Sequence, residues 1–191
     1  MNKPTFSSST RRFSARNLTA AALLVCAAWS ISTPVHPEGS RRCGAHLTAE
    51  EALRRLNAAR VRGAVCHRPG ALAVASPVTW SPSLAAVALA QSQDMAELAR
   101  MAHVDRHNRG LAERLKALGY RFSAAVENVA VGYASIDAVF DAWLESEGHC
   151  DNLMNGTVLE FGLACSDARP DGGPTLGRYW TLVLGAPQRV H

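Results

Sequence analysis

The beginning of the sequence contains no acidic residue, since Glu38 is the first carboxylate in the chain. It also lacks an apolar run long enough to cross a bilayer comfortably, because its apolar stretch covers only residues 18–32. Four basic residues precede that stretch. A basic start followed by a short apolar run is typical of a secretory signal. We therefore predict a signal peptide and short linker over residues 1–37, with cleavage between about Ala28 and Pro37. An uncleaved membrane anchor is the main alternative.

The exported part of the chain lacks a net charge. The whole sequence has 20 Lys and Arg residues against 16 Asp and Glu residues, and the entire excess lies within residues 1–37. The basic balance is therefore a property of the leader and does not indicate binding to nucleic acid or to anionic membranes. We expect no nucleic-acid partner and a monomeric protein.

The sequence also lacks two familiar hydrolase motifs, G-x-S-x-G and H-E-x-x-H. A serine–histidine nucleophile pair can still be drawn, because Ser146 and His149 stand three residues apart, a spacing at which helix side chains meet. The sequence supplies neither an acid to orient the histidine nor an oxyanion hole. We therefore expect Ser146 to close a helix end with a backbone hydrogen bond, and we predict no catalytic residues.

An even number of cysteines remains once Cys26 is removed with the leader: Cys43, Cys66, Cys150 and Cys165. In an exported protein this predicts two disulfides, and the sequence cannot choose among the three connectivities that four cysteines allow. We favour Cys43–Cys66 and Cys150–Cys165, because each closes a short loop, worth about 3 kcal/mol in chain entropy. The alternative is a zinc site made of Cys43, His46, Cys66 and His67. The spacing of these four residues matches no standard zinc finger.

Helical periodicity predicts four helices, with Thr48, Ser81 and Ser135 as N-caps of the first, second and fourth. Their ranges are 48–63, 81–101, 110–119 and 135–148, with Gly148 as the stop of the last. Each has an apolar stripe, and the residues that we expect in the core include Leu53, Leu56, Val61, Leu84, Val87, Ala88, Met95, Leu98, Leu111, Leu115, Leu118, Ile136, Val139, Phe140, Trp143 and Leu144.

Strand-like runs fill the end of the sequence. An extended piece carries Glu127 and Asn128, and a Gly- and Pro-rich hairpin loop separates two further runs at residues 159–167 and 178–186. The mature sequence has no internal repeat, low-complexity tract or second domain. This order of elements predicts a single α+β layered domain over residues 38–191, with its core at about 48–186.

Eight short motifs in this order resemble the bacterial branch of the CAP superfamily, the cysteine-rich secretory, antigen 5 and pathogenesis-related 1 (SCP-like) proteins. They are LNAAR (56–60), VTWSPSL (78–84), AQSQDMAELARMAH (90–103), RLKALGY (114–120), AVENVAVGY (125–133), AWLESEGHCDNLM (142–154), FGLAC (161–165) and YWTLVLG (179–185). The resemblance implies an α-β-α sandwich with a cleft lined by histidines and glutamates.

Carried over residue by residue, the resemblance places His103, Glu127 and His149 in that cleft. The fourth acidic position departs from the pattern, because Ser146 stands there. Its neighbours Glu145 and Glu147 are the remaining candidates, although consecutive helical residues point in different directions. A further departure is a cysteine at position 150, where bacterial relatives usually carry arginine.

Two imidazoles and a carboxylate are ligands for first-row metals, so the resemblance implies a metal site of His103, His149 and Glu127, with zinc as the expected ion. The structural alternative is that both histidines hold loops together and that Glu127 accepts backbone N–H groups. We expect Trp143 in the core and Asn152 to pin the turn.

The sequence therefore predicts a secreted or periplasmic CAP-domain protein that binds a ligand or a divalent metal in its cleft. Its partner would be a small ligand, a lipid or an envelope component. A metal-dependent hydrolase acting on peptides or cell-envelope material is the alternative. An interaction module at the cell surface is a third possibility, if the leader stays attached.

Overall fold

The computed structural model describes residues 48–66, 73–168 and 177–188. The chain divides between His36 and Pro37, and every described residue belongs to the second unit, Pro37–His191. The predicted signal peptide (residues 1–37) and Cys43 lie outside the described residues.

Helices and strands are interleaved along the described residues. In chain order the elements are α1 (Ala49–Arg62), β1 (Thr79–Trp80), α2 (Pro82–Glu97), α3 (Leu111–Ala117), β2 (Phe122–Val131), α4 (Ile136–Glu145), α5 (Glu147–Leu153), β3 (Glu160–Asp167) and β4 (Arg178–Pro187).

The predicted N-caps are confirmed. The hydroxyl of Thr48 accepts a hydrogen bond from the N–H of Glu51 (3.0 Å) at the start of α1. Ser81 and Ser135 accept the corresponding bonds at the starts of α2 and α4. These bonds satisfy N–H groups that the first turn of a helix leaves without a partner, so the helix starts are fixed by local sequence.

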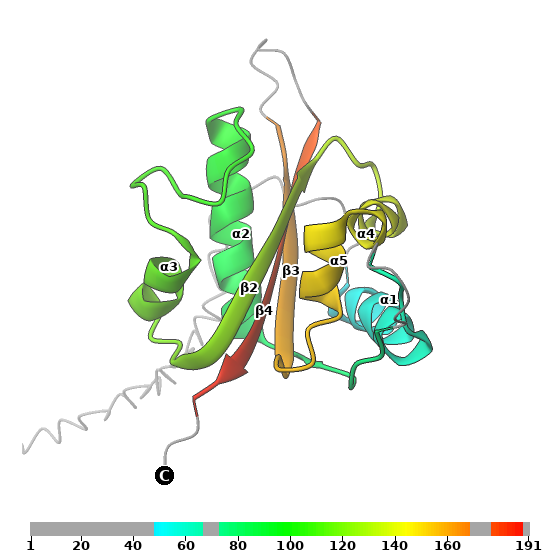
Figure 1. Cartoon of the computed structure of the whole chain (residues 1–191). Helices are drawn as coiled ribbons and strands as arrows, with labels where there is room; N and C mark the ends of the chain where they lie inside the picture. Colours follow the sequence, from blue (N-terminus) through cyan, green and yellow to red (C-terminus); the bar gives the residue numbers. More distant parts are fainter. Residues whose placement is uncertain (1–47, 67–72, 169–176, 189–191) are drawn as a thin grey trace, which may run out of the picture. The chain divides into compact units, whose positions relative to one another are not determined.

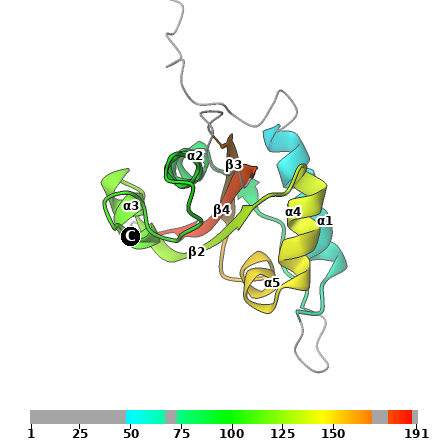
Figure 2. The same ribbon diagram turned by 90° about the horizontal axis from the view of Figure 1, so that it is seen from above.

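The four strands form one sheet with the order β1-β3-β4-β2. Strand β1 pairs with β3 in parallel, while β3 with β4 and β4 with β2 are antiparallel. Helices α2 and α3 lie on one side of the sheet, and α1, α4 and α5 lie on the other (Figures 1 and 2). This is the predicted α-β-α sandwich, and it buries apolar side chains on both faces of the sheet.

Most predicted core residues are buried, and the exceptions lie at helix ends. Val61 is 59% exposed in the last turn of α1, and Leu98 (47%) and Leu118 (51%) follow α2 and α3 as their C-caps. The predictions for these three residues were wrong because each helical stripe was extended past the point where the helix leaves the sheet.

Gly162 allows α2 to lie directly on β3. A Cβ atom at this position would stand 2.0 Å from the backbone N of Ala85 and 2.4 Å from the backbone C of Leu84. Side chains cannot adopt such distances, so a glycine is required wherever a helix backbone approaches a strand this closely. The contact fixes the layer of α2 against the sheet.

The prediction that Gly148 ends a helix was wrong. Helix α4 ends at Glu145, Ser146 has an extended backbone, and α5 then runs through Gly148. The stretch WLESEGHCDN therefore contains the end of one helix and most of a second. One extended residue is enough to redirect the chain, and it turns the face that carries His149 toward strand β2.

Candidate functional site

Glu127 is the centre of the candidate site. It lies on β2, where pairing with β4 fixes its backbone, and its side chain is only 3% exposed. Its Oε1 atom is 2.9 Å from Nδ1 of His103, and its Oε2 atom accepts a hydrogen bond from Nη2 of Arg114 (2.8 Å). A buried carboxylate needs such partners, because an unpaired buried charge is costly.

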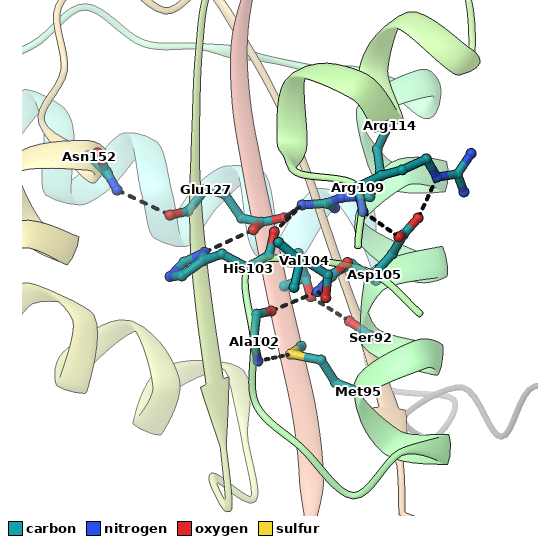
Figure 3. A network of polar contacts seen from close by, with 12 residues as sticks. Ser92, Met95, Ala102, His103, Val104, Asp105, Arg109, Arg114, Glu127 and Asn152 are labelled. Carbon is teal, nitrogen blue, oxygen red and sulfur yellow. Dashed lines mark hydrogen bonds and ion pairs between the residues drawn. The ribbon is translucent and has the colours of Figure 1, made fainter. Parts of the chain in front are cut away.

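Arg114 is the site residue that the sequence analysis missed. It comes from α3, its side chain is 5% exposed, and Nη2 also donates to the backbone oxygen of His103 (3.2 Å). Figure 3 shows its guanidinium group directed toward Glu127. The only sequence signal was its place in the RLKALGY motif, and an arginine on a short helix is ordinarily solvent-exposed.

His103 lies in the loop between α2 and α3 and is held by one ring nitrogen. Its side chain remains 60% exposed although Nδ1 contacts Glu127. The hydrogen bond to Glu127 raises the pKa of His103, while partial burial and the nearby charge of Arg114 oppose that rise. The contact with Glu127 uses Nδ1, so this bond fixes the orientation of the ring and does not involve Nε2.

Helix α5 is attached to β2 beside Glu127. The side chain of Asn152 donates to the backbone oxygen of Glu127 (3.1 Å) and to Oδ1 of Asn128 (2.8 Å). Asn128 in turn donates to the backbone oxygen of His149 (3.0 Å). Asn152 therefore holds helix α5 to strand β2 (Figure 3 shows its contact with Glu127), where the sequence analysis expected it to pin a turn. These bonds fix His149 relative to the strand that carries Glu127.

Ser146 has two contacts at the junction of α4 and α5. Its N–H donates to the backbone oxygen of Trp143 (3.3 Å), the expected closure of the helix end. Its hydroxyl lies 2.9 Å from Nδ1 of His149. Partial burial and the charge of His103 both lower the pKa of His149. Trp143 is in the core, as predicted, with 1% exposure.

Glu145 and Glu147 lie on either side of Ser146 and are exposed. Within the described residues, neither carboxylate takes part in a hydrogen bond or an ion pair. The same residues contain no group of three or more His, Cys, Asp or Glu side chains positioned to hold a metal ion. The structure thus brings His103 to Glu127 and Ser146 to His149, and it leaves the two flanking glutamates at the surface.

The favoured disulfide pairing was wrong. Cys66 is bonded to Cys150, 84 residues away in sequence, which excludes both Cys43–Cys66 and Cys150–Cys165. It also removes Cys66 from the alternative zinc site. Cys165 is disulfide-bonded as well. The favoured pairing rested on the small entropy cost of short loops, whereas the fold places α5 beside the segment that follows α1.

We expect the two histidines to titrate on opposite sides of the ordinary histidine pKa of about 6.5. The pKa of His103 should lie above this value, because Glu127 stabilises its imidazolium. The pKa of His149 should lie below it, because burial and the charge of His103 disfavour the imidazolium of His149. The His103 contact should therefore stabilise the fold fully below about pH 6.5 and progressively less as the pH rises through the folded-state pKa. For His149 the sign is opposite, and its contribution is lost as the pH falls below about 6.5.

Histidine ring resonances followed by NMR during a pH titration measure both values. The variant Glu127→Gln should lower the pKa of His103, because the hydrogen bond that raises this pKa is removed. Equal titration midpoints for His103 and His149 would contradict the opposite pKa shifts. An unchanged pKa of His103 in Glu127→Gln would show that Glu127 does not cause its shift.

The layered fold and the His–Glu pair define the class, a CAP-type α-β-α domain. The profile of the CAP family, the cysteine-rich secretory protein family, matches residues 53–184, so this chain belongs to that family.

Two relatives from Bacillus subtilis (strain 168) are the uncharacterized membrane protein YlbC, 34% identical over 84 residues, and the uncharacterized protein YkwD, 30% identical over 87 residues. The matches cover 44% and 46% of this chain but only 24% and 34% of those proteins.

Solved structures show the same fold. An extracellular protein containing an SCP domain from Bacillus anthracis matches with a TM-score of 0.57 at 24% identity, over 72% of this chain and 40% of that one. An outer surface protein from Borrelia burgdorferi matches with a TM-score of 0.59 at 14% identity, over 78% of this chain and 100% of that one. In the described part of this chain, no helix has the length and hydrophobicity needed to cross a bilayer.

Proposed function

We propose that this is an exported CAP-domain protein that binds a divalent metal or a small ligand at His103 and His149. The observation that supports this proposal is that both imidazoles are oriented through Nδ1. Glu127 contacts Nδ1 of His103 and Ser146 contacts Nδ1 of His149, at 2.9 Å in both cases. No hydrogen bond between described residues engages either Nε2 atom. Export is supported by the leader-like start of the sequence and by relatives whose names describe an extracellular and an outer surface protein.

In this proposal Glu127 orients a ligand residue and is not itself a ligand. Both of its oxygens already have partners, His103 and Arg114. A carboxylate behind a metal-binding histidine fixes the ring and raises its basicity. The donor set that fits zinc is therefore two imidazoles, with the remaining positions open to water or to a ligand atom. Such a site binds zinc more weakly than a closed site of four protein ligands.

Catalysis is not part of this proposal. Ser146 and His149 are in contact, but no carboxylate among the described residues contacts the other nitrogen of His149. A metal-dependent hydrolase acting on peptides or envelope material is the alternative to screen once metal binding has been measured.

Calorimetric titration of the purified protein with zinc tests the proposal. We expect one saturable site, lost in both His103→Ala and His149→Ala, and weakened about tenfold or more in Glu127→Gln because the orienting contact is removed. His107→Ala is the matched control, since His107 is an exposed histidine of the same loop, and it should bind zinc like the parent. Absence of saturable binding, or binding that survives both histidine substitutions in folded protein, would contradict the metal site.

A further inference from the structure

A buried glutamine on α2 holds the segment of chain that contains His103. Gln91 is fully buried, and its Nε2 atom donates to the backbone oxygens of Ala102 (2.6 Å) and Val104 (3.3 Å). These two residues stand on either side of His103. Because both of these neighbouring atoms are carbonyl oxygens, only the nitrogen of the Gln91 amide can face them, and this fixes the direction of both bonds.

The backbone of residues 102–104 is held at each of its three carbonyl groups. Gln91 holds the first and the third, and Arg114 donates to the backbone oxygen of His103 (3.2 Å). The N–H of Ala102 donates to Sδ of Met95 (3.5 Å), which also lies on α2. Figure 3 shows Ala102 directed toward Met95 and the ring of His103 directed toward Glu127. The place of His103 is therefore set by side chains from two helices.

Packing in α2 does not account for a glutamine at this position. Ala88 and Met95 lie about one turn before and after Gln91 on the same face of the helix, and both are buried and apolar. A buried amide costs free energy when one of its ends has no hydrogen bond, and Oε1 of Gln91 has no partner among the described residues. Both bonds that Gln91 does make go to the His103 segment. Such a departure from an apolar stripe is expected where a side chain supports a site.

We propose that Gln91 is a positioning residue for His103, and that it sets where the imidazole meets Glu127. Helix α2 is fixed on the sheet by its close contact at Gly162, and Glu127 lies on a strand of the same sheet. Gln91 connects this fixed helix to the loop that carries His103, so the contact of 2.9 Å between ring and carboxylate depends on Gln91. The inference rests on the proposed function only in its consequence for metal binding.

The variant Gln91→Met tests the positioning role without a metal. Methionine fills similar space but has no donor, so both bonds to the loop are lost. We expect the backbone order parameters of residues 102–104, measured by ¹⁵N relaxation, to fall from about 0.85 to below about 0.6. The ring resonances of His103 should move toward those of the variant Glu127→Gln, because the same contact is weakened. Gln91→Asn, whose amide is one methylene further from the loop, is the second variant and should change both readouts in the same direction.

Ser92→Ala is the matched control. Ser92 is the next residue of α2 and is also fully buried, but its hydroxyl lies 3.2 Å from the backbone oxygen of Ala164 and 3.0 Å from Oγ1 of Thr181, both on the sheet. This variant also loses buried hydrogen bonds, yet it should leave residues 102–104 and the ring of His103 as in the parent. Unchanged order parameters and ring resonances in folded Gln91→Met or Gln91→Asn would overturn the proposal. The same changes in Ser92→Ala would overturn it as well.

Zinc calorimetry on the same variants gives the second arm. With a parent that binds zinc at one site, Gln91→Met should weaken the affinity at least about tenfold, as loss of a group that orients a ligand does, and Ser92→Ala should bind like the parent. Unchanged affinity in Gln91→Met would overturn the link between Gln91 and the site. A parent that binds no zinc would contradict the proposed function, and the NMR comparison would then decide the role of Gln91 by itself.

Discussion

Arg114→Met is expected to lower the free energy of unfolding by about 4 kcal/mol, the range found when one partner of a buried ion pair is removed. Methionine fills similar space but leaves the carboxylate of Glu127 with 3% exposure and without its arginine. The hydrogen bond from Arg114 to the backbone oxygen of His103 is lost as well. Urea denaturation of the parent and the variant measures the difference.

Two comparisons separate this effect from a general loss of an arginine. Arg106→Met removes a surface arginine that pairs with Asp94 and Glu97 and is 40% exposed, and it should destabilise the protein much less than Arg114→Met, because solvent screens exposed ion pairs. The double variant Arg114→Met/Glu127→Gln should regain part of the loss, because the buried carboxylate is then gone. A cost for Arg114→Met no larger than that for Arg106→Met would show that the pair does not anchor the site.

Loss of the Cys66–Cys150 disulfide is expected to destabilise the protein by about 4 kcal/mol. The bond closes a loop with a sequence separation of 84, and long loops gain the most in the chain-entropy account. Cys66 and Cys150 are 4% and 0% exposed, so the variant Cys66→Ala/Cys150→Ala also leaves a small unfilled volume. Denaturation of this variant beside the parent measures the change.

The same variant should loosen the candidate site, because Cys150 follows His149 on α5. The hydrogen bonds of Asn128 and Asn152 would then hold α5 to β2 without the covalent link. We expect the ring resonances of His149 to broaden or shift more than those of the exposed reference His107. Peptide mapping of the parent under non-reducing conditions is the control. A Cys43–Cys66 peptide there would refute the pairing.

Local interactions let the sequence predict most of the elements and several residues of the site. Capping by Thr48, Ser81 and Ser135 depends on contacts within three residues, and the periodicity of α4 follows from its own side chains. Ordered motifs were sufficient to predict the CAP fold, and they also single out His103, Glu127 and His149, whose role as a binding site stays a prediction. Helix ends were less certain, as Val61 and Leu98 show, because the point where a helix leaves the sheet depends on the partner surface.

Only the tertiary structure decided which distant groups meet. Arg114 is 13 residues from Glu127 and its partner role has no local signal, and Cys66 finds Cys150 although closer cysteines cost less entropy to join. In both cases the packing of helices on the sheet sets the distance. The sequence by itself determined the local elements and the family, because those depend on neighbouring residues. The connections within the site depend on how the layers pack.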